Sequence, residues 1–270
     1  KPQGDQVGYT IDSIPGALTL EQITAAGLNQ LYNRLDSVHP GFFLMIEAGN
    51  IDWAAHANDG GAVIKEILNF QKSIDIAYQF YLQHPDETLI IVTADHDTGG
   101  MALGRKENRK PNLSLADFQR ISKDRFSDYC KARYKEGAAF TWPMMRTFMQ
   151  ENLGFFGKVD ITAEQEEQLK QDFEKIFHQG RGRDEKTLYN DFNQYAVQVF
   201  DLLNIKMGIG WTTSNHTGNF VPVYAVGAGA ENFGHNLNNT DIVELIYKIT
   251  GAKKPLPYTF GEKDGKRKNP

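Results

Sequence analysis

Several side chains able to bind metal ions follow directly after one apolar run, Phe42–Ile46. Glu47 comes first, and Asp52 and His56 follow it with a spacing of four residues. On one turn of helix this spacing places both side chains on the same face, so a carboxylate oxygen and an imidazole nitrogen can bind one zinc ion. Glu47 adds a hard oxygen ligand of the kind that magnesium prefers. The segment therefore predicts a metal site.

Two further segments also carry side chains able to bind metal ions next to an apolar run. Asp95 and His96 end the apolar run 88–93, and His216 comes shortly before a third apolar run, 221–226. Taken singly, an acid and a histidine at the end of a strand form a structural hydrogen bond more often than they bind a metal. Together, six such groups at the edges of three buried strands would be desolvated without partners, which favours metal ions.

The elements that position these residues follow from the apolar pattern. The three apolar runs are continuous, as is typical of strands buried in a parallel sheet. Thr19 is expected to cap the first helix, Thr240 and Asp241 the last, and Asn58 and Asp59 the one between them. These helices are predicted at residues 20–35, 62–82 and 240–251. The alternation of strands and helices predicts an α/β fold, with a mostly parallel sheet between two layers of helices.

Residues 105–205 differ from this pattern, because they show helix-like segments and no convincing strand. The segments are 114–134, 142–152, 162–177 and 186–203. We therefore expect an α/β core in two segments, 1–104 and 206–270, with a helical insertion at 105–205. The aromatic residues of the insertion are expected to form its own small core; a rim over the site or a dimer contact is the alternative. They are Phe140, Trp142, Phe148, Phe155 and Phe156.

Composition narrows the classes of protein. The 270 residues are 40% hydrophobic and 23% charged, and the net charge of -5 comes without a basic stripe, so nucleic acid is not an expected partner. No apolar run approaches the ~18 residues of a membrane-spanning helix. The single cysteine, Cys130, excludes an internal disulfide and a cysteine zinc cluster, and is expected to be a packing residue. Because the chain opens at Lys1 without a signal-peptide pattern, we expect its natural amino terminus to lie upstream.

At the level of motifs, the sequence resembles the carboxy-terminal half of alkaline phosphatases over residues 17–104 and 206–250. The motifs are, in order, F-F-L-M-I-E-A-G-N-I-D-W-A-A-H-A-N-D, I-V-T-A-D-H-D-T-G-G and H-T-G-N-F-V-P-V-Y-A-V-G-A-G-A. The resemblance implies a three-layer alkaline-phosphatase-like core whose amino-terminal part is missing from this chain.

The same resemblance implies a ligand set, position by position. Asp52, His56 and His216 would bind a first zinc ion (Zn2+). Asp95 and His96 would bind a second zinc ion, and Glu47 would bind magnesium (Mg2+). Trp53 replaces a Lys or His of some relatives, and Asp97 replaces a Glu of many, but neither change removes a ligand.

For the full-length parent, the resemblance implies hydrolysis of phosphate monoesters through a phosphoserine intermediate. It also implies a homodimer located in the periplasm or secreted. Three family residues have no counterpart here: the aspartate shared by the second zinc and magnesium, the nucleophilic serine, and the phosphate-binding arginine. We therefore expect one complete zinc site, two partial metal sites, and no activity of this chain alone.

Three alternatives remain at this point. Asp12 and Ser13 faintly resemble the Asp-Ser pair of the nucleophile, but their place directly before the first helix favours a plain turn. The chain could also be a metal-binding module without catalysis. A related phosphodiesterase or sulfatase is the third alternative, and Glu47 argues against it because those relatives lack this magnesium ligand.

Overall fold

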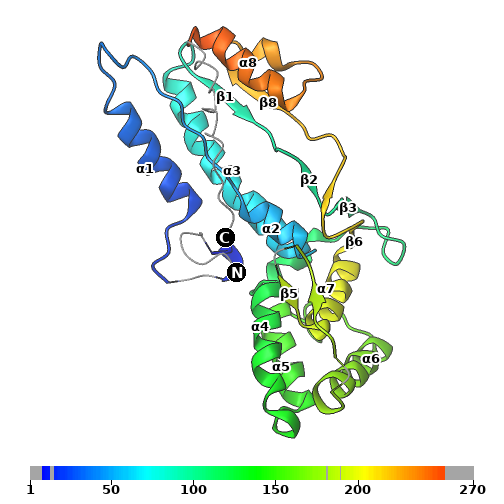
Figure 1. The fold of residues 1–270 in the computed structure, drawn as a ribbon. Coiled ribbons are helices and arrows are strands. Elements are labelled where there is room, and N and C mark those ends of the chain that lie inside the picture. Colours follow the sequence, from blue (N-terminus) through cyan, green and yellow to red (C-terminus); the bar gives the residue numbers. More distant parts are fainter. Residues whose placement is uncertain (1–7, 13–14, 181, 189, 253–270) are drawn as a thin grey trace, which may run out of the picture. The chain divides into compact units, whose positions relative to one another are not determined.

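The computed structural model describes residues 8–12, 15–180, 182–188 and 190–252 (Figure 1). These residues form two compact units. The first consists of the described residues up to Phe80 together with His96–Val221, and the second of Tyr81–Asp95 together with residues 222–252. Ser13, for which a turn is expected, lies outside the described residues. The division into a core and a helical insertion stays a prediction.

Helices make up most of the first unit. Its α-helices are α1 (Leu20–Tyr32), α2 (Asn50–His56), α3 (Gly60–Gln83, whose last turn enters the second unit), α4 (Lys123–Tyr134), α5 (Trp142–Leu153), α6 (Ala163–Phe173) and α7 (Gln194–Met207). Shorter helical turns are η1 (Thr10–Asp12), η2 (Leu113–Phe118), η3 (Gly137–Ala139) and the π-helical η4 (Glu174–His178). No helix in the described part of the chain is both long and apolar enough to cross a membrane.

Side-chain caps explain where several helices begin. Thr19 caps α1, as predicted, and exchanges hydrogen bonds with Gln22 in a capping box. Asp59 accepts from the N–H of Ala62 in the first turn of α3, which confirms its capping role. In the second unit, α8 (Asn239–Thr250) is capped by Asn238 together with Asp241. The cap predicted at Thr240 is therefore wrong by two residues.

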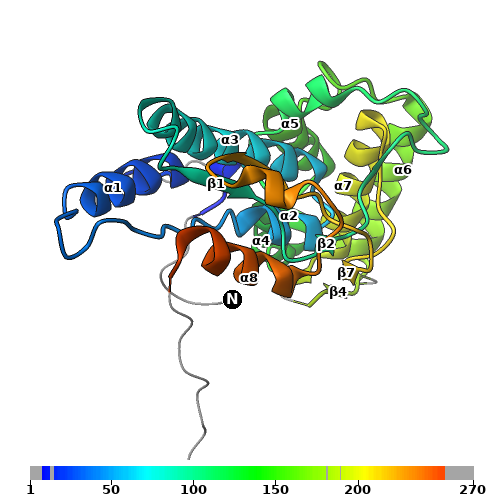
Figure 2. The ribbon, with the colours of Figure 1, turned by 90° about the horizontal axis from the view of Figure 1, so that it is seen from above.

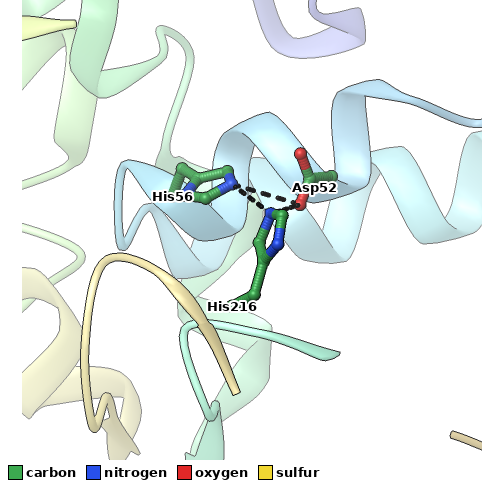
Figure 3. Close-up of side chains that lie close together, drawn as sticks. All are labelled: Asp52, His56 and His216. Carbon is green, nitrogen blue, oxygen red and sulfur yellow. Dashed lines mark hydrogen bonds and ion pairs between the residues drawn. The ribbon is translucent and has the colours of Figure 1, made fainter. Parts of the chain in front are cut away.

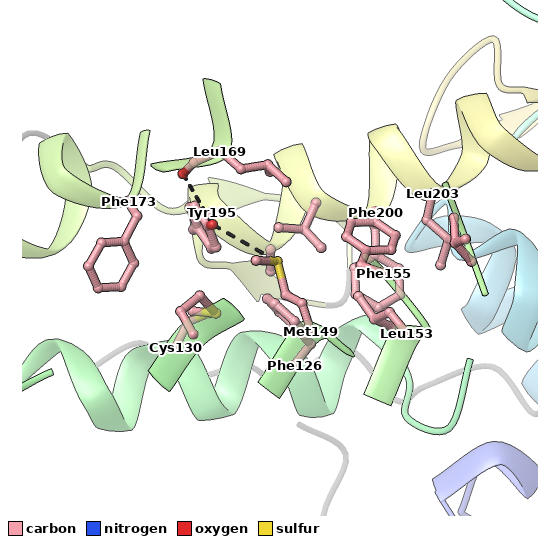
Figure 4. Packing of buried hydrophobic residues seen from close by; sticks show 14 of the residues in the cluster. Phe126, Cys130, Met149, Leu153, Phe155, Leu169, Phe173, Tyr195, Phe200 and Leu203 are labelled. Carbon is pink, nitrogen blue, oxygen red and sulfur yellow. Dashed lines mark hydrogen bonds between the residues drawn. The ribbon is translucent and has the colours of Figure 1, made fainter. Parts of the chain in front are cut away.

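The helical part of the first unit packs around one large apolar core (Figure 4). Apolar side chains from α4, α5, α6 and α7 meet there, and α7 lies beside α6 (Figure 2). Tyr195 of α7 is completely buried, and its hydroxyl donates to the Leu169 carbonyl at 3.2 Å, so its polar atom has a partner. Cys130 is completely buried as well, which confirms its packing role, and burial raises the pKa of its thiol.

The aromatic residues of this region are core residues, as predicted. Phe140 and Phe155 are completely buried, and Trp142, Phe148 and Phe156 pack against the same core. Tyr129 stacks on Phe148 with ring centroids 3.6 Å apart. Aromatic burial therefore contributes a large share of the buried apolar surface that stabilises the helices α4, α5, α6 and α7, which we call the helical group.

Strands are short, and every pair of named strands among the described residues is antiparallel. In the second unit, β1 (Leu89–Val92) pairs with β8 (Tyr224–Gly227). In the first unit, the pairs are β2 (Asp97–Thr98) with β7 (His216–Thr217), β3 (Ala102–Leu103) with β6 (Ile209–Gly210), and β4 (Glu185–Lys186) with β5 (Asp191–Phe192). The chain thus combines helices and strands, but its observed pairing differs from the mostly parallel sheet that was expected. Within the described residues, β1 has a neighbour along one edge only.

The run Phe42–Ile46 also differs from expectation, because it forms no strand. It is extended, and its side chains alternate between half-buried and exposed, with Phe43 70% and Met45 76% exposed. A strand is defined by ladder hydrogen bonds, and no other segment of the described chain supplies them here.

Two helices predicted in the 105–205 region begin later than expected. The predicted helix 114–134 is interrupted before Ser122, whose side chain caps α4 by accepting from Arg125 N–H. The predicted helix 186–203 starts only after Asn193, which caps α7, and the β4–β5 hairpin precedes it. Ser and Asn side chains favour helix starts over helix interiors, which explains both shifts.

Candidate metal centre

The short helix α2 carries two of the predicted ligands on one face. Asp52 lies in its first turn and His56 in its last, as the spacing of four residues predicts. The same helix carries Ala54 and Ala55, which are buried in a small apolar cluster. Trp211 packs against this cluster. This apolar packing fixes the position of α2, which carries Asp52 and His56.

His216 reaches the same place from the strand β7. Its neighbour Thr217 pairs with Asp97 of β2, and the Thr217 hydroxyl donates to the Asp97 carboxylate. The amide of Asn219 donates to the same carboxylate at 3.2 Å. Asp97 therefore fixes the strand that carries His216.

Three ligand atoms converge between α2 and β7 (Figure 3). The His56 Nε2 atom lies 3.4 Å from Asp52 Oδ1 and 3.1 Å from His216 Nε2, and His216 Nε2 lies 3.9 Å from Asp52 Oδ1. Tetrahedral zinc with bonds of about 2.0–2.1 Å separates its ligand atoms by about 3.3 Å. The donor set and its spacing therefore fit a zinc ion.

The proton on the His56 ring is placed by a backbone carbonyl. His56 Nδ1 lies 2.6 Å from the Ser214 oxygen, which can only accept, so Nδ1 carries the hydrogen. In the neutral ring, Nε2 then presents its lone pair toward Asp52 and His216. A ligand histidine whose other nitrogen donates to a carbonyl is the arrangement that protein metal sites use to orient imidazole.

Exposure suggests the kind of site that these residues form. His56 is 2% exposed, whereas the side chains of Asp52 and His216 are 29% and 41% exposed. Structural zinc sites close four protein ligands around the ion, while catalytic sites use three and keep one position open. A set of two imidazoles and one carboxylate, accessible from one side, fits the second kind.

His96 lies beside the three ligands without joining them. Its ring stacks on that of His216, with centroids 3.5 Å apart. The hydroxyl of Thr98 donates to Asp52 Oδ1 at 2.5 Å and lies 3.2 Å from His96 Nδ1. Sequence reasoning missed Thr98 as a residue of the site. Its position could have indicated this role, because Thr98 lies two residues after His96 in the motif that contains Asp95 and His96.

The remaining predicted ligands are not part of this group of three ligand atoms. Glu47 is exposed at the end of the extended run, outside the group formed by the three ligand atoms. Asp95 belongs to the second unit and is exposed in a bend after β1. Among the described residues, the one group of three ligand atoms close enough to share an ion is Asp52, His56 and His216. The second zinc site and the magnesium site stay predictions.

Glycine allows the loop beside the site to pack closely. Gly99 has φ +79°, and a Cβ there would lie 2.6 Å from the Trp211 side chain and 3.2 Å from the Ala55 carbonyl. Its N–H donates to the Asn215 carbonyl at 2.9 Å. Gly99 thus holds the residues just before His216 against the end of α2, a contact for which a side chain leaves no room.

Comparison with known proteins gives this chain its class. Residues 9–252 match the sequence model of the family described as Alkaline phosphatase. The chain therefore belongs to the alkaline phosphatase family, whose members are phosphatases and thus hydrolases.

Individual relatives agree with this membership. The chain is 28% identical over 236 residues to alkaline phosphatase 4 of Bacillus subtilis, covering 87% of this chain and 44% of that protein. It is 28% identical over 244 residues to the alkaline phosphatase of Schizosaccharomyces pombe, covering 89% of this chain and 42% of that protein. The chain thus spans less than half the length of these relatives.

Solved structures confirm the α/β fold. A cold-active alkaline phosphatase from Shewanella sp. matches with a TM-score of 0.66 and 28% identity, over 90% of this chain and 52% of that one. The alkaline phosphatase of Thermus thermophilus matches with a TM-score of 0.64 and 23% identity, over 91% of this chain and 51% of that one.

Proposed function

We propose that this chain carries a zinc site of a phosphate monoesterase, formed by Asp52, His56 and His216. The observation that carries the proposal is the spacing of the three ligand atoms, 3.1 to 3.9 Å, at a position open on one side. A zinc ion held there would supply a Lewis acid that stabilises negative charge on an oxygen of the phosphate ester.

The roles of the surrounding residues follow from their contacts. The Ser214 carbonyl holds the His56 ring, so that Nε2 faces the site. Thr98 holds the carboxylate of Asp52 in place. The proposal further assigns Asp95 and His96 to a second zinc ion and Glu47 to magnesium, on the family resemblance of their motifs. Export of the parent protein and its homodimeric state are part of the proposal on the same ground.

The proposal includes the division of work in the parent protein. The hydroxyl that lies against Asp52 is that of Thr98, and it donates to the carboxylate, which suits a positioning role better than nucleophilic attack. We assign the nucleophilic serine to a part of the parent outside this sequence, so the chain alone would bind zinc without turnover.

The test uses the full-length parent protein and the 270-residue chain side by side. The parent should hydrolyse p-nitrophenyl phosphate at alkaline pH and lose this activity when a chelator removes its metals. Strong hydrolysis of bis(p-nitrophenyl) phosphate with little monoesterase activity would contradict the assignment and favour a phosphodiesterase.

A second candidate function is a metal-binding module without catalysis, favoured by the complete triad in a chain with no assigned nucleophile. Zinc binding by the isolated chain without any turnover fits either candidate. Turnover of the intact parent separates them, because an inert module would leave the parent inactive too.

A further inference from the structure

Asn58, two residues after His56, has an unusual backbone conformation. Its φ is +52°, a left-handed conformation in which side chains other than glycine are uncommon. Asn58 was expected to cap α3, but its contacts point elsewhere. One terminal atom of its side-chain amide lies 3.0 Å from the carbonyl oxygens of both Thr213 and Ala55. Because a carbonyl oxygen can only accept, we assign the amide nitrogen to this position, from which Asn58 donates to both. This double donation explains why asparagine, and not glycine, occupies the position.

The two carbonyls belong to the two segments that supply the ligands, which we call the two arms of the metal centre. One arm is α2, with Asp52 and His56, and the other is the loop that leads into His216. Ala55 lies on α2 between the ligands Asp52 and His56. Thr213 precedes Ser214, whose carbonyl holds His56, and the same loop leads into His216. One side chain therefore joins the helix that carries two ligands to the loop that carries the third.

Two side chains of the helical group also donate hydrogen bonds to the backbone of residues 57 and 58. On α7, the amide of Asn204 donates to the Asn58 carbonyl at 2.8 Å. On α4, the ammonium group of Lys123 donates to the Ala57 carbonyl at 2.8 Å. Residues 57 and 58, directly after His56, are thus each fixed by a polar side chain of the helical group.

Asp59 extends this junction. Its carboxylate is 1% exposed and accepts from the amide of Gln119 at 2.8 Å and from the backbone N–H of Lys123 at 2.7 Å. Burial raises the pKa of Asp59, and these hydrogen bonds oppose that rise. A buried and largely satisfied network of this kind favours one arrangement of the backbone.

We propose that Asn58 is a positioning residue of the zinc site, which holds the Asp52–His56 arm and the His216 arm at ligand distance. The inference rests on the proposed zinc site and adds a residue that is not one of its three ligands. It also gives the helical group a role in metal binding, because Asn204 and Lys123 fix the segment in which Asn58 lies.

The test compares zinc binding by the wild-type 270-residue chain, Asn58→Gly and Asn58→Asp. Glycine accepts φ +52° without strain but removes both amide hydrogen bonds. Aspartate keeps the size of the side chain but faces two carbonyls with an acceptor. Zinc affinity is measured by competition with a chromophoric chelator. Loss of a residue that orients ligands lowers metal affinity by about 10–100-fold, and we expect this range for Asn58→Gly and a loss at least as large for Asn58→Asp.

Two further readouts separate positioning from loss of structure. Thermal unfolding without metal should be nearly the same for wild type and Asn58→Gly. With cobalt in place of zinc, the visible absorption bands of tetrahedral Co2+ should weaken in the variant. Asn193→Ala is the matched control: it removes a buried asparagine that caps α7, so it should lower thermal stability and leave zinc affinity unchanged.

The outcomes are distinct. Wild-type affinity and an unchanged cobalt spectrum in Asn58→Gly would overturn the role of Asn58 while leaving the proposed zinc site intact. A zinc affinity that falls equally in Asn193→Ala would overturn it too, because general stability would then explain the loss. Failure of the wild-type chain to bind zinc would overturn the proposed function, and this inference with it.

Discussion

The Nε2 atoms of His56 and His216 face each other at 3.1 Å, although the two residues are 160 positions apart in the sequence. His56 Nδ1 donates to Ser214, so the Nε2 atom that points to His216 carries a lone pair in the neutral ring. Two imidazole nitrogens and a carboxylate oxygen at these distances suit a shared cation better than a set of direct hydrogen bonds.

Removal of either imidazole should therefore abolish tight zinc binding. We expect His56→Ala and His216→Ala each to lower the zinc affinity of the chain by more than about 100-fold, because loss of a ligand exceeds the effect of losing its orienting partner. Isothermal titration calorimetry measures this directly. His39→Ala is the control, because His39 is 74% exposed and pairs with Asp36 away from the site. Equal loss in all three variants would point to nonspecific binding.

Thr98 provides a finer test of how Asp52 is oriented. Thr98→Val keeps the shape of the side chain but removes the hydroxyl that donates to Asp52 Oδ1. We expect zinc affinity to fall by about 10–100-fold, and Thr98→Ser to restore most of it because serine supplies the same donor. The same zinc titration checks both variants. If Val and Ser behave alike, the hydroxyl does not orient the carboxylate.

Gly99 tests the packing that brings the two arms together. Gly99→Ala places a Cβ at φ +79° and 2.6 Å from the Trp211 side chain. We expect the free energy of unfolding to fall by at least about 1–3 kcal/mol, the cost of a left-handed residue other than glycine. Denaturant unfolding measures the change. Gly41→Ala is the control, since a Cβ there meets nothing within 4 Å; a similar loss in both variants would disprove the contact.

His178 predicts a pH dependence in the helical group. One ring nitrogen faces the Phe140 carbonyl at 2.8 Å and the other the Glu174 carboxylate at 2.6 Å, so the protonated ring satisfies both acceptors. Mainly through the Phe140 carbonyl, and also through Glu174, the fold raises the pKa of His178 above its usual 6.5.

The sign of the effect follows from that shift. A raised folded pKa stabilises the protein fully below the unfolded pKa, and this contribution is lost as the pH rises through the folded value. Wild type should therefore exceed His178→Gln in stability by more at about pH 5.5 than at about pH 9. Thermal unfolding at both pH values checks this. A difference that stays constant, or that grows with pH, would contradict the assignment.

Much of the helical structure could be predicted from local signals. Thr19, followed three residues later by Gln22, marks the start of α1, and the spacing of Asp52 and His56 placed both on one face of α2. Such features depend on neighbouring residues alone, so the sequence carries them. Of the six predicted ligands, the structure joins Asp52, His56 and His216.

Features that depend on distant partners could not be predicted in this way. The run Phe42–Ile46 has the apolar character of a buried strand, but a strand also needs hydrogen-bonded neighbours, and none of the described segments provides them. The roles of Thr98 and Asn58 depend on contacts with Asp52 and with Thr213 across the fold. Such contacts leave no periodic trace in the sequence.

The position of a bound zinc ion tests the central claim most directly. Crystals of the 270-residue chain grown with one equivalent of zinc would locate the ion by anomalous scattering at the zinc absorption edge. The strongest peak should lie about 2.0–2.2 Å from Asp52 Oδ1, His56 Nε2 and His216 Nε2. A strongest peak at other carboxylates, with no density between these three side chains, would contradict the proposed site.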